Sequence, residues 1–379
     1  MTRPLPPFRM TGATLLRDGA LQQRSLAVQN GRLTRGPLPE VDLSGYLILP
    51  GIIDLHGDAF ERHIAPRPTA PFPALPALRA TDRDAAANGV TTAWMAQSWS
   101  WEGGLRGPAA AEALLAALEA YGPEAGTDLR VQVRCETHTV ETFDRLLAAL
   151  RRYGVGYVVF NNHLPEAEAS DRHETPQAQL ARLAAHRQRA EVPRYLCRLA
   201  EAFDTLGIIY GSHDDPDGET REAFSMIGAK ICEFPTTRAA AGLAKAVGDP
   251  VLMGAPNVVR GGSQGGNIAA QTLIELGLCD ALVSDYHYPS LAAAAFRLAD
   301  QGLKSLPAAW AMISQTPAEI MGLHDRGVIE DGKRADLAIV NAETRVIEAT
   351  LCEGRLTHLA GEAANRFLGA SARMQMAAE

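Results

Sequence analysis

The feature that most constrains the fold is a repeated alternation of short apolar runs with longer stretches that have helical spacing. Each run is three to six residues long and contains Val, Ile or Leu, and Ala- and Leu-rich segments separate most of them. This pattern predicts β-strands that alternate with α-helices. The eight runs are residues 51–56, 90–94, 130–134, 157–160, 208–210, 230–232, 251–253 and 281–283.

Eight alternations predict an α/β fold with a (β/α)8 TIM-like barrel, in which parallel strands close into a ring. A doubly wound open sheet is the alternative, because a sequence does not show whether the first and last strands meet. Helical spacing is clearest at residues 139–152 and 177–203. Pro193 predicts that the second of these stretches is broken into two helices.

The two ends of the chain have a different pattern. Short strand-like runs at residues 12–16, 26–28 and 46–49 are separated by turns such as Asn30-Gly31. Two more runs, 334–340 and 345–352, lie near the C-terminus. We therefore expect residues 1–50 and 328–379 to pair into a small β-sandwich domain, and residues 51–327 to form the barrel.

Residues of the types that bind metals stand at the ends of several predicted strands. Because such barrels build their sites at the C-terminal ends of their strands, we expect these side chains to converge. Imidazole and carboxylate ligands suit one or two Zn²⁺ ions, with Mn²⁺ or Fe²⁺ as alternatives. The candidate metal ligands are His56, Asp58, Glu136, His163, His213 and Asp285.

The roles within this set differ. A bound divalent metal can turn water into hydroxide near neutral pH, and a nearby carboxylate can take the proton. Asp285 ends the last predicted strand and is the natural catalytic proton acceptor. Asp58 could ligate the metal or orient another ligand. The alternative for the whole set is a chance arrangement of structural histidines.

A glycine-rich segment at residues 259–267 follows the seventh predicted strand. Glycines let backbone N–H groups approach an anion, so this segment is either a phosphate site or a structural loop. Basic residues could add charge, although arginines beside acidic groups could equally be ion-pair partners. The candidate substrate-binding residues are Arg62, His63, Arg67, Lys230, Arg260, Gly261, Gly262 and Ser263.

Composition narrows the class of partner. The net charge is −8, which argues against a broad nucleic-acid surface but leaves a local basic pocket open. The N-terminus lacks the apolar core of a signal peptide, and no run of 18 apolar residues predicts a membrane span. We therefore expect a cytoplasmic enzyme for a small molecule, with no nucleic-acid or membrane partner; the sequence leaves a homo-oligomer open.

Several motifs resemble known proteins. Leu49-Pro-Gly-Ile-Ile-Asp-Leu-His56 and Gly332-Lys-Arg-Ala-Asp-Leu-Ala-Ile339 resemble the first barrel strand and the return to the β-domain in the amidohydrolase superfamily. Others resemble the PhnM family, the α-D-ribose 1-methylphosphonate 5-triphosphate diphosphatases of phosphonate breakdown. These motifs are Glu61-Arg-His-Ile-Ala-Pro-Arg-Pro68, Arg134-Cys-Glu136, Ser212-His-Asp-Asp215, Glu233-Phe-Pro-Thr-Thr237, Met253-Gly-Ala-Pro-Asn-Val-Val-Arg-Gly-Gly-Ser263 and Ser284-Asp-Tyr286.

The resemblance implies a metal-dependent hydrolase that converts a ribose 5-triphosphate to the 5-phosphate and pyrophosphate, so the substrate is a phosphorylated sugar or nucleotide-like molecule. It also implies that Glu136 is a carboxylate that bridges metals. One departure from the family pattern is the run Asn161-Asn162-His163-Leu164-Pro165, where His163 is kept but its neighbours differ.

The same scaffold hosts many reactions, so two alternatives stay open. One is an amidohydrolase that cleaves an amide, a lactam or an N-acetylated phospho-sugar. The other is a non-catalytic scaffold homologue.

Overall fold

The computed structural model describes residues 5–67, 70–169, 175–263 and 265–376. The chain divides into two compact units. The first unit consists of Met1–Ala93, Tyr121–Leu129 and Ala281–Glu379, and the second of Trp94–Ala120 and Arg130–Asp280. The domain boundaries expected at residues 50/51 and 327/328 therefore lie inside the first unit, and they stay a prediction.

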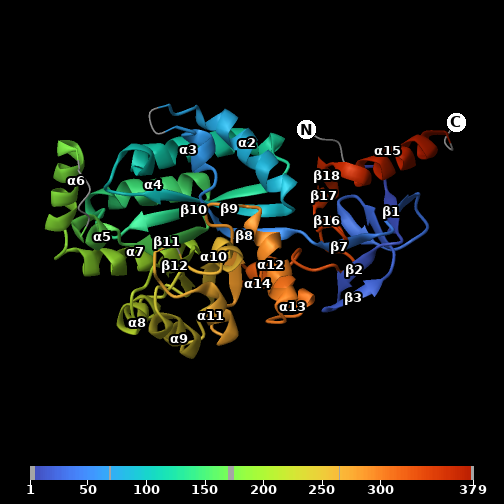
Figure 1. Ribbon diagram of the computed structural model, residues 1–379. Helices are drawn as coiled ribbons and strands as arrows, with labels where there is room; N and C mark the ends of the chain where they lie inside the picture. Colours follow the sequence, from blue (N-terminus) through green and yellow to red (C-terminus); the bar gives the residue numbers. More distant parts are fainter. Residues whose placement is uncertain (1–4, 68–69, 170–174, 264, 377–379) are drawn as a thin grey trace. The chain divides into compact units, whose positions relative to one another are not determined.

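Eight parallel strands form one sheet in the order β15-β14-β13-β12-β11-β10-β9-β8 (Figure 1). The two strands at the ends of this order, β15 and β8, both belong to the first unit. They meet there through a parallel bridge between Gly57 and Asp285. This contact closes the ring, so the (β/α)8 barrel is confirmed and the open sheet was wrong. The strands are β8 (Ile52–Gly57), β9 (Val90–Trp99), β10 (Asp128–Glu136), β11 (Tyr157–Asn161), β12 (Ile209–His213), β13 (Ile231–Glu233), β14 (Val251–Gly254) and β15 (Ala281–Val283).

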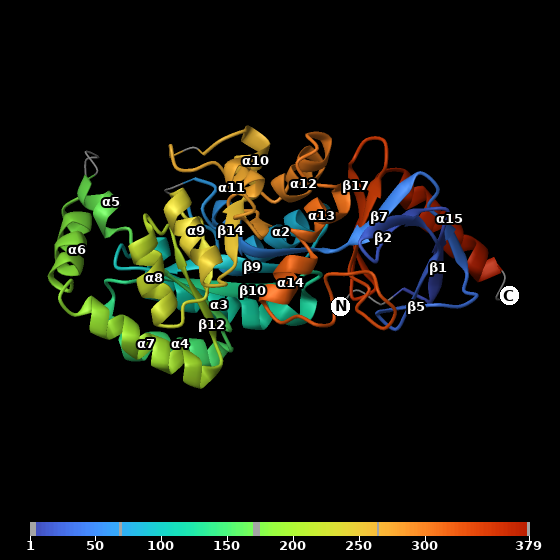
Figure 2. The same cartoon turned by 90° about the horizontal axis from the view of Figure 1, so that it is seen from below.

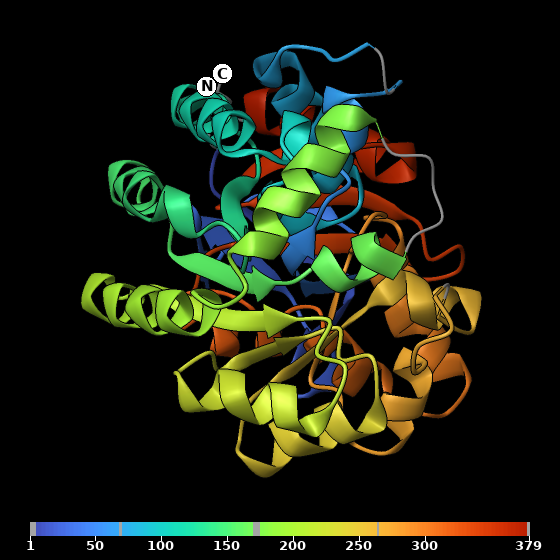
Figure 3. The ribbon, with the colours of Figure 1, turned by 90° about the vertical axis from the view of Figure 1, so that its left-hand side faces the viewer.

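Helices of the second unit surround its strands, as the green and yellow ribbons of Figure 3 show. Their ends follow from local sequence: Thr237 accepts a hydrogen bond from the Ala240 amide at the start of α9, and α7 ends at Gly207 with φ +66°. These helices are α4 (Phe143–Tyr153), α5 (Leu164–Ala169), α6 (Pro176–Arg187), α7 (Val192–Leu206), α8 (Gly218–Met226), α9 (Arg238–Ala246), α10 (Ala255–Arg260) and α11 (Ala270–Glu275), with the 3-10 turns Gly104–Arg106 and Val140–Thr142.

The break predicted near Pro193 separates α6 from α7. Proline lacks an N–H and is tolerated in the first turn of a helix, which is where α7 has it. Tyr195, Leu199 and Phe203 then repeat at intervals of four and are buried. Burial of each such side chain contributes roughly 1.5–3 kcal/mol, which accounts for the docking of this face.

The remaining barrel helices of the first unit are α1 (Glu61–Ile64), α2 (Ala74–Ala87), α12 (Ser290–Asp300), α13 (Leu306–Ala311) and α14 (Gln315–Ile320), with the 3-10 turn η2 (Gly122–Glu124). Helix α3 (Pro108–Tyr121) belongs to the second unit except for its last residue. Among the described residues, no helix combines the length and the apolar character that a membrane span needs.

The chain ends form two further sheets in the first unit, which we call the β-domain (residues 8–50 and 337–376; Figure 2). Strand β7 pairs with β16, so Ile48 lies opposite Ile339, and the Asn30-Gly31 turn has both residues at positive φ, as its hairpin requires. One apolar cluster joins the two sheets, which confirms the predicted sandwich. The elements are β1 (Phe8–Thr11), β2 (Thr14–Arg17), β3 (Ala20–Gln23), β4 (Leu26–Gln29), β5 (Arg32–Thr34), β6 (Glu40–Asp42), β7 (Tyr46–Pro50), β16 (Leu337–Asn341), β17 (Ile347–Cys352), β18 (Arg355–Leu359) and α15 (Gly361–Met376).

Candidate active site

In the first unit, the backbone holds three of the predicted residues together. The Asp285 amide donates to the His56 carbonyl at 3.0 Å, and the Asp58 amide donates to the Asp285 carbonyl at 2.8 Å. His56 is the last residue but one of β8 and is buried, whereas Asp58 and Asp285 are half-buried. The ends of the first and last barrel strands therefore present one imidazole and two carboxylates side by side.

A third aspartate, which is fully buried, holds the segment before Asp285. Asp54, within β8, accepts hydrogen bonds from the Ser284 amide at 2.8 Å and the Ser284 hydroxyl at 2.6 Å. Burial raises the pKa of Asp54, and the two Ser284 hydrogen bonds oppose that shift. The pair fixes the segment that leads into Asp285. Sequence reasoning missed Asp54, although an aspartate inside an otherwise apolar strand is a usable signal.

In the second unit, Glu136 and His163 form a close pair. Glu136 ends β10 and is 1% exposed; its carboxylate lies 2.8 Å from His163 Nδ1 and accepts the His163 amide at 3.0 Å. Burial opposes ionisation of Glu136, but the hydrogen bonds and charge of His163 lower the pKa of its carboxyl. Burial likewise acts to lower the pKa of His163, and Glu136 outweighs it and raises that pKa.

The atypical run around His163 has a defined structure. The Asn161 side-chain amide lies 3.2 Å from His163 Nε2, so both ring nitrogens face a polar partner. Asn162 accepts a hydrogen bond from the Leu164 amide, where α5 begins. The two asparagines therefore orient the histidine and start the next helix.

His213 ends β12 beside a short polar turn. Its Nδ1 lies 2.9 Å from the Asp214 carboxylate, and its ring lies 4.9 Å from that of Phe234. Burial acts to raise the pKa of Asp214, but the charge and hydrogen bond of His213 lower it. An imidazole that contacts a carboxylate in this way is oriented, as metal-binding histidines usually are.

Glu233 ends β13 opposite His213 in the strand register and was missing from the predicted ligands. Its carboxylate is fully buried and accepts hydrogen bonds from Gln132 at 2.6 Å and from the Tyr157 hydroxyl at 2.5 Å. Ligand atoms of His213 and Glu233 lie within 4.8 Å of each other. The structure therefore contains a possible His/Glu metal site, and the strand-end position of Glu233 was the signal that could have found it.

Arg134 is a second residue that the predicted set lacks. Side chains two apart on a strand point to the same face, so Gln132, Arg134 and Glu136 share one face of β10. The positive charge of Arg134 contributes to lowering the pKa values of Glu136 and Asp214. A guanidinium beside several carboxylates can stabilise them or contact an anionic substrate.

The predicted basic residues near the first strand lie in and after α1. Arg62 and Arg67 are exposed, and His63 Nε2 lies 3.5 Å from the Asp84 carboxylate. Lys230 stands immediately before β13, at its N-terminal end, where its ammonium donates to the Ser225 carbonyl at 3.1 Å. Lys230 is therefore at the opposite end of that strand from Glu233.

The glycine-rich segment, residues 259–267, begins in a helix and continues past its end. Val259 and Arg260 are the last two residues of α10. The Gly261 and Gly262 amides both donate to the Asn257 carbonyl, at 3.1 and 3.0 Å. They therefore cap the C-terminus of α10. The Ser263 hydroxyl accepts the Gly265 amide at 3.3 Å.

Comparisons with known proteins were made on the sequence and on the fold. No protein-family model matches the chain. It is 34% identical over 361 residues to an alpha-D-ribose 1-methylphosphonate 5-triphosphate diphosphatase of Escherichia coli (strain K12), covering 86% of this chain and 93% of that protein.

Solved structures share the fold at much lower identity. A dihydropyrimidinase from Brevibacillus agri superposes with a TM-score of 0.62 and 11% identity, covering 94% of this chain and 97% of that one. An N-acetylglucosamine-6-phosphate deacetylase from Pasteurella multocida gives a TM-score of 0.62 and 13% identity, covering 92% of this chain and 99% of that one.

Proposed function

Because the chain belongs to the α-D-ribose 1-methylphosphonate 5-triphosphate diphosphatase family of the amidohydrolase superfamily, we propose that it hydrolyses this ribose triphosphate to the 5-phosphate and pyrophosphate. Water would attack the α-phosphorus, and the bond from that phosphorus to the oxygen bridging to the β-phosphate would break. The substrate is then a small phosphorylated sugar, and the reaction belongs to phosphonate breakdown.

Members of the superfamily depend on divalent metal, and the donor set of this chain fits that requirement. The strand ends offer imidazoles and carboxylates that are largely buried, the combination that Zn²⁺, Mn²⁺ and Fe²⁺ accept. Such an ion lowers the pKa of water and neutralises phosphate charge. The proposed ligands are His56, Asp58, Glu136, His163, His213 and Asp285, together with Glu233.

Residues of this chain would carry the rest of the reaction. Asp285 would accept the proton of the attacking water, since its carboxylate stands at the end of the last strand and its backbone is held from both sides. Arg134 would balance charge on the phosphates from within the barrel face of β10. Arg62, His63, Arg67, Arg260 and Ser263 are proposed substrate contacts; Lys230 is not, because it lies at the other end of β13.

The observation that carries this proposal is the set of oriented strand-end pairs, Glu136 with His163 and His213 with Asp214. A scaffold protein has no need to bury an acid such as Glu136 against a histidine at the C-terminal edge of a barrel, because burial of charge is costly.

The test is phosphorus NMR of the purified, metal-loaded protein with the ribose 1-methylphosphonate 5-triphosphate. We expect pyrophosphate and the 5-phosphate as the only products. Release of acetate from an N-acetylated phospho-sugar, without pyrophosphate from the triphosphate, would replace the proposal with an amidohydrolase activity. Absence of any turnover in protein of confirmed metal content would favour a scaffold role.

A further inference from the structure

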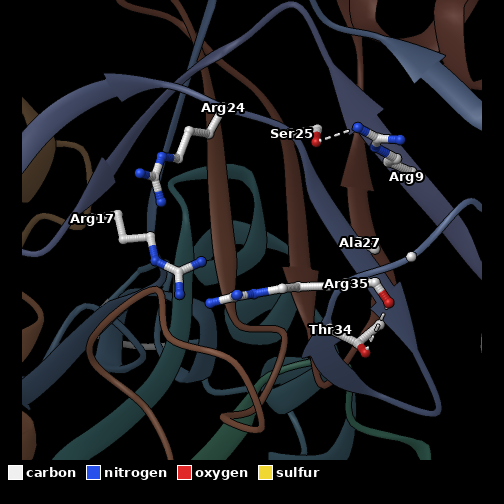
Figure 4. A pocket seen from close by; sticks show the side chains of 8 residues that line it. Arg9, Arg17, Arg24, Ser25, Ala27, Thr34 and Arg35 are labelled. Carbon is white, nitrogen blue, oxygen red and sulfur yellow. Dashed lines mark hydrogen bonds between the residues drawn. The ribbon is translucent and has the colours of Figure 1, made fainter.

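A pocket in the β-domain, which we call the arginine pocket, gathers four arginines, and no strand-end residue of the candidate active site is among its lining residues (Figure 4). Its volume is about 510 Å³. The arginines come from separate elements: β1, β2, the β3–β4 turn and the segment after β5. The lining residues are Arg9, Arg17, Arg24, Ser25, Ala27, Thr34, Arg35 and Gly36.

The guanidinium groups converge without enough carboxylates to pair with them. Figure 4 shows Arg17, Arg24 and Arg35 turned toward one another. Arg17 and Arg35 share the Asp331 carboxylate, which lies 3.1 Å from Arg17 Nη1, and the exposed Asp18 carboxylate lies 3.8 Å from Arg17 Nε. Arg24 has no hydrogen bond or ion pair to any of the described residues.

The rest of the pocket also offers donors. Arg9 donates to the Ser25 hydroxyl at 2.7 Å. The Glu40 carboxylate lies 3.7 Å from Arg9 Nη1, and its side chain is 58% exposed. Arg17 Nε is buried and makes no hydrogen bond within the described structure. No Asp or Glu lines the pocket among the residues described. Like charges held this close repel each other, so the arrangement favours an anion that bridges them.

The shape and lining of the pocket select the class of anion. A concave site of this volume holds a small molecule, whereas nucleic acid needs an extended basic surface, which the net charge of −8 disfavours. Among the described residues, no aromatic side chain lines the pocket, so none of them can stack on a base there. Several separate guanidiniums suit a chain of phosphates with charge on each unit.

We propose that the arginine pocket is a binding site for an oligophosphate such as pyrophosphate, distinct from the strand-end residues. The site would take up one anion through Arg17, Arg24 and Arg35, with Arg9 and Ser25 at its border. This goes beyond the proposed hydrolysis and does not depend on it, because every lining residue belongs to the β-domain.

The test is isothermal titration of the metal-loaded protein with pyrophosphate, comparing wild type with the double variant Arg24→Gln/Arg35→Gln. Both side chains are exposed, so the fold should survive, which a thermal melt checks. We expect one binding event to weaken by about ten-fold or more for each guanidinium removed, while the rate of triphosphate hydrolysis is unchanged.

Arg32→Gln is the matched control, since Arg32 lies on the same hairpin and donates instead to the Gly332 carbonyl. It should leave pyrophosphate binding intact. Equal binding by wild type and the double variant would overturn the proposal, as would equal loss in the control. If hydrolysis were absent in all variants but the binding difference persisted, the proposed function would fail and the arginine pocket would stand.

Discussion

At the scale of single residues, the turns at the catalytic edge of the barrel use unusual backbone. Asp214, Phe234 and Asp285 follow β12, β13 and β15 within two residues, and their φ angles are +59°, +50° and +55°. Residues other than glycine rarely adopt this region, and aspartate and asparagine tolerate it better than most. Each turn reverses the chain directly after a strand, which holds the strand-end side chains in place.

Asp285 lends itself to a clean substitution for this reason. In Asp285→Asn the backbone at φ +55° should be retained, because asparagine also tolerates left-handed geometry. The variant loses only the basic carboxylate. We expect metal content to stay close to wild type and kcat to fall by about 10²–10⁴-fold, the usual contribution of a general base. Metal analysis and product assays on the same preparation measure both.

Asp300→Asn is the control, because Asp300 is an exposed aspartate that pairs with Arg345. It should keep full activity. A normal rate in Asp285→Asn would show that another group accepts the proton, and a loss of metal in that variant would instead make Asp285 chiefly a ligand.

Position at the end of a predicted strand identified several of the candidate site residues from the sequence, but it missed one and included another that lies elsewhere. His56 and Asp285 could be paired from the sequence once a closed ring was assumed, and one backbone hydrogen bond joins them in the structure. Glu233 occupies an equivalent position but was left out of the ligand set. Lys230 was included although it begins the predicted run 230–232, and in the structure it precedes β13 at the N-terminal end.

At the scale of elements, periodicity predicted the strands to within a few residues but not the local use of the glycines. Gly261 and Gly262 share one carbonyl at the end of α10. The sequence of an anion-binding loop and that of a helix C-cap look alike, since both need glycine at positive φ or close backbone approach. The six-residue helix α10 directly before Gly261 shows that the glycines here form a helix C-cap.

The β-domain ends in a helix whose start depends on one carboxylate. Glu348, in β17, accepts hydrogen bonds from the Ala363 amide at 2.9 Å and the Tyr46 hydroxyl at 2.7 Å. Burial acts to raise the pKa of Glu348, but these bonds outweigh it and lower the pKa below 4.5, while burial and then Glu348 raise the pKa of Tyr46 to about 12. Gly361 leaves room for this contact, because a Cβ there would lie 2.5 Å from the carboxylate.

A depressed folded-state pKa adds stability above the unfolded value, and that stability is lost as the pH falls through the folded value. We therefore expect Glu348→Gln to lower the free energy of unfolding by about 1–3 kcal/mol at pH 7. The difference from wild type should shrink once the pH falls well below 4.5, the ordinary pKa of the group. Urea unfolding at several pH values measures it.

Glu362→Gln provides the comparison, since Glu362 stands in the same helix start but is 56% exposed. Glu362→Gln should change the free energy of unfolding by no more than about 0.5 kcal/mol, both at pH 7 and at acidic pH. A constant gap between Glu348→Gln and wild type across the pH range would mean that shape, and not ionisation, decides the role of Glu348.

At the scale of the whole molecule, the first compact unit is assembled from three separate stretches of chain, Met1–Ala93, Tyr121–Leu129 and Ala281–Glu379. The pairing of the chain ends could be predicted from their matching strand patterns. The sequence could not predict that the short middle stretch also belongs to this unit. That stretch is held by polar contacts between residues far apart in sequence, and such contacts leave no periodic pattern.

Arg326 makes such contacts to all three stretches. Arg326 lies in the last stretch, and its Nε donates to Asp325 of the same stretch at 2.9 Å. Its Nη1 donates to Thr92 Oγ1 of the first stretch at 2.9 Å and to the Asp128 carboxylate of the middle stretch at 2.6 Å. The side chain is 6% exposed. Its planar fork reaches several acceptors at once, which a lysine ammonium would do poorly.

Arg326→Met should therefore destabilise the unit by about 3 kcal/mol, because it leaves the Asp128 and Asp325 carboxylates without this partner while keeping a side chain of similar length. Arg326→Lys should recover only part of that loss. Arg79→Met is the comparison: Arg79 pairs with Glu124 at the surface and should cost less than about 1 kcal/mol. Chemical unfolding of the three variants measures these losses, and equal losses for Arg326→Met and Arg79→Met would mean that the polar contacts of Arg326 do not hold the three stretches together.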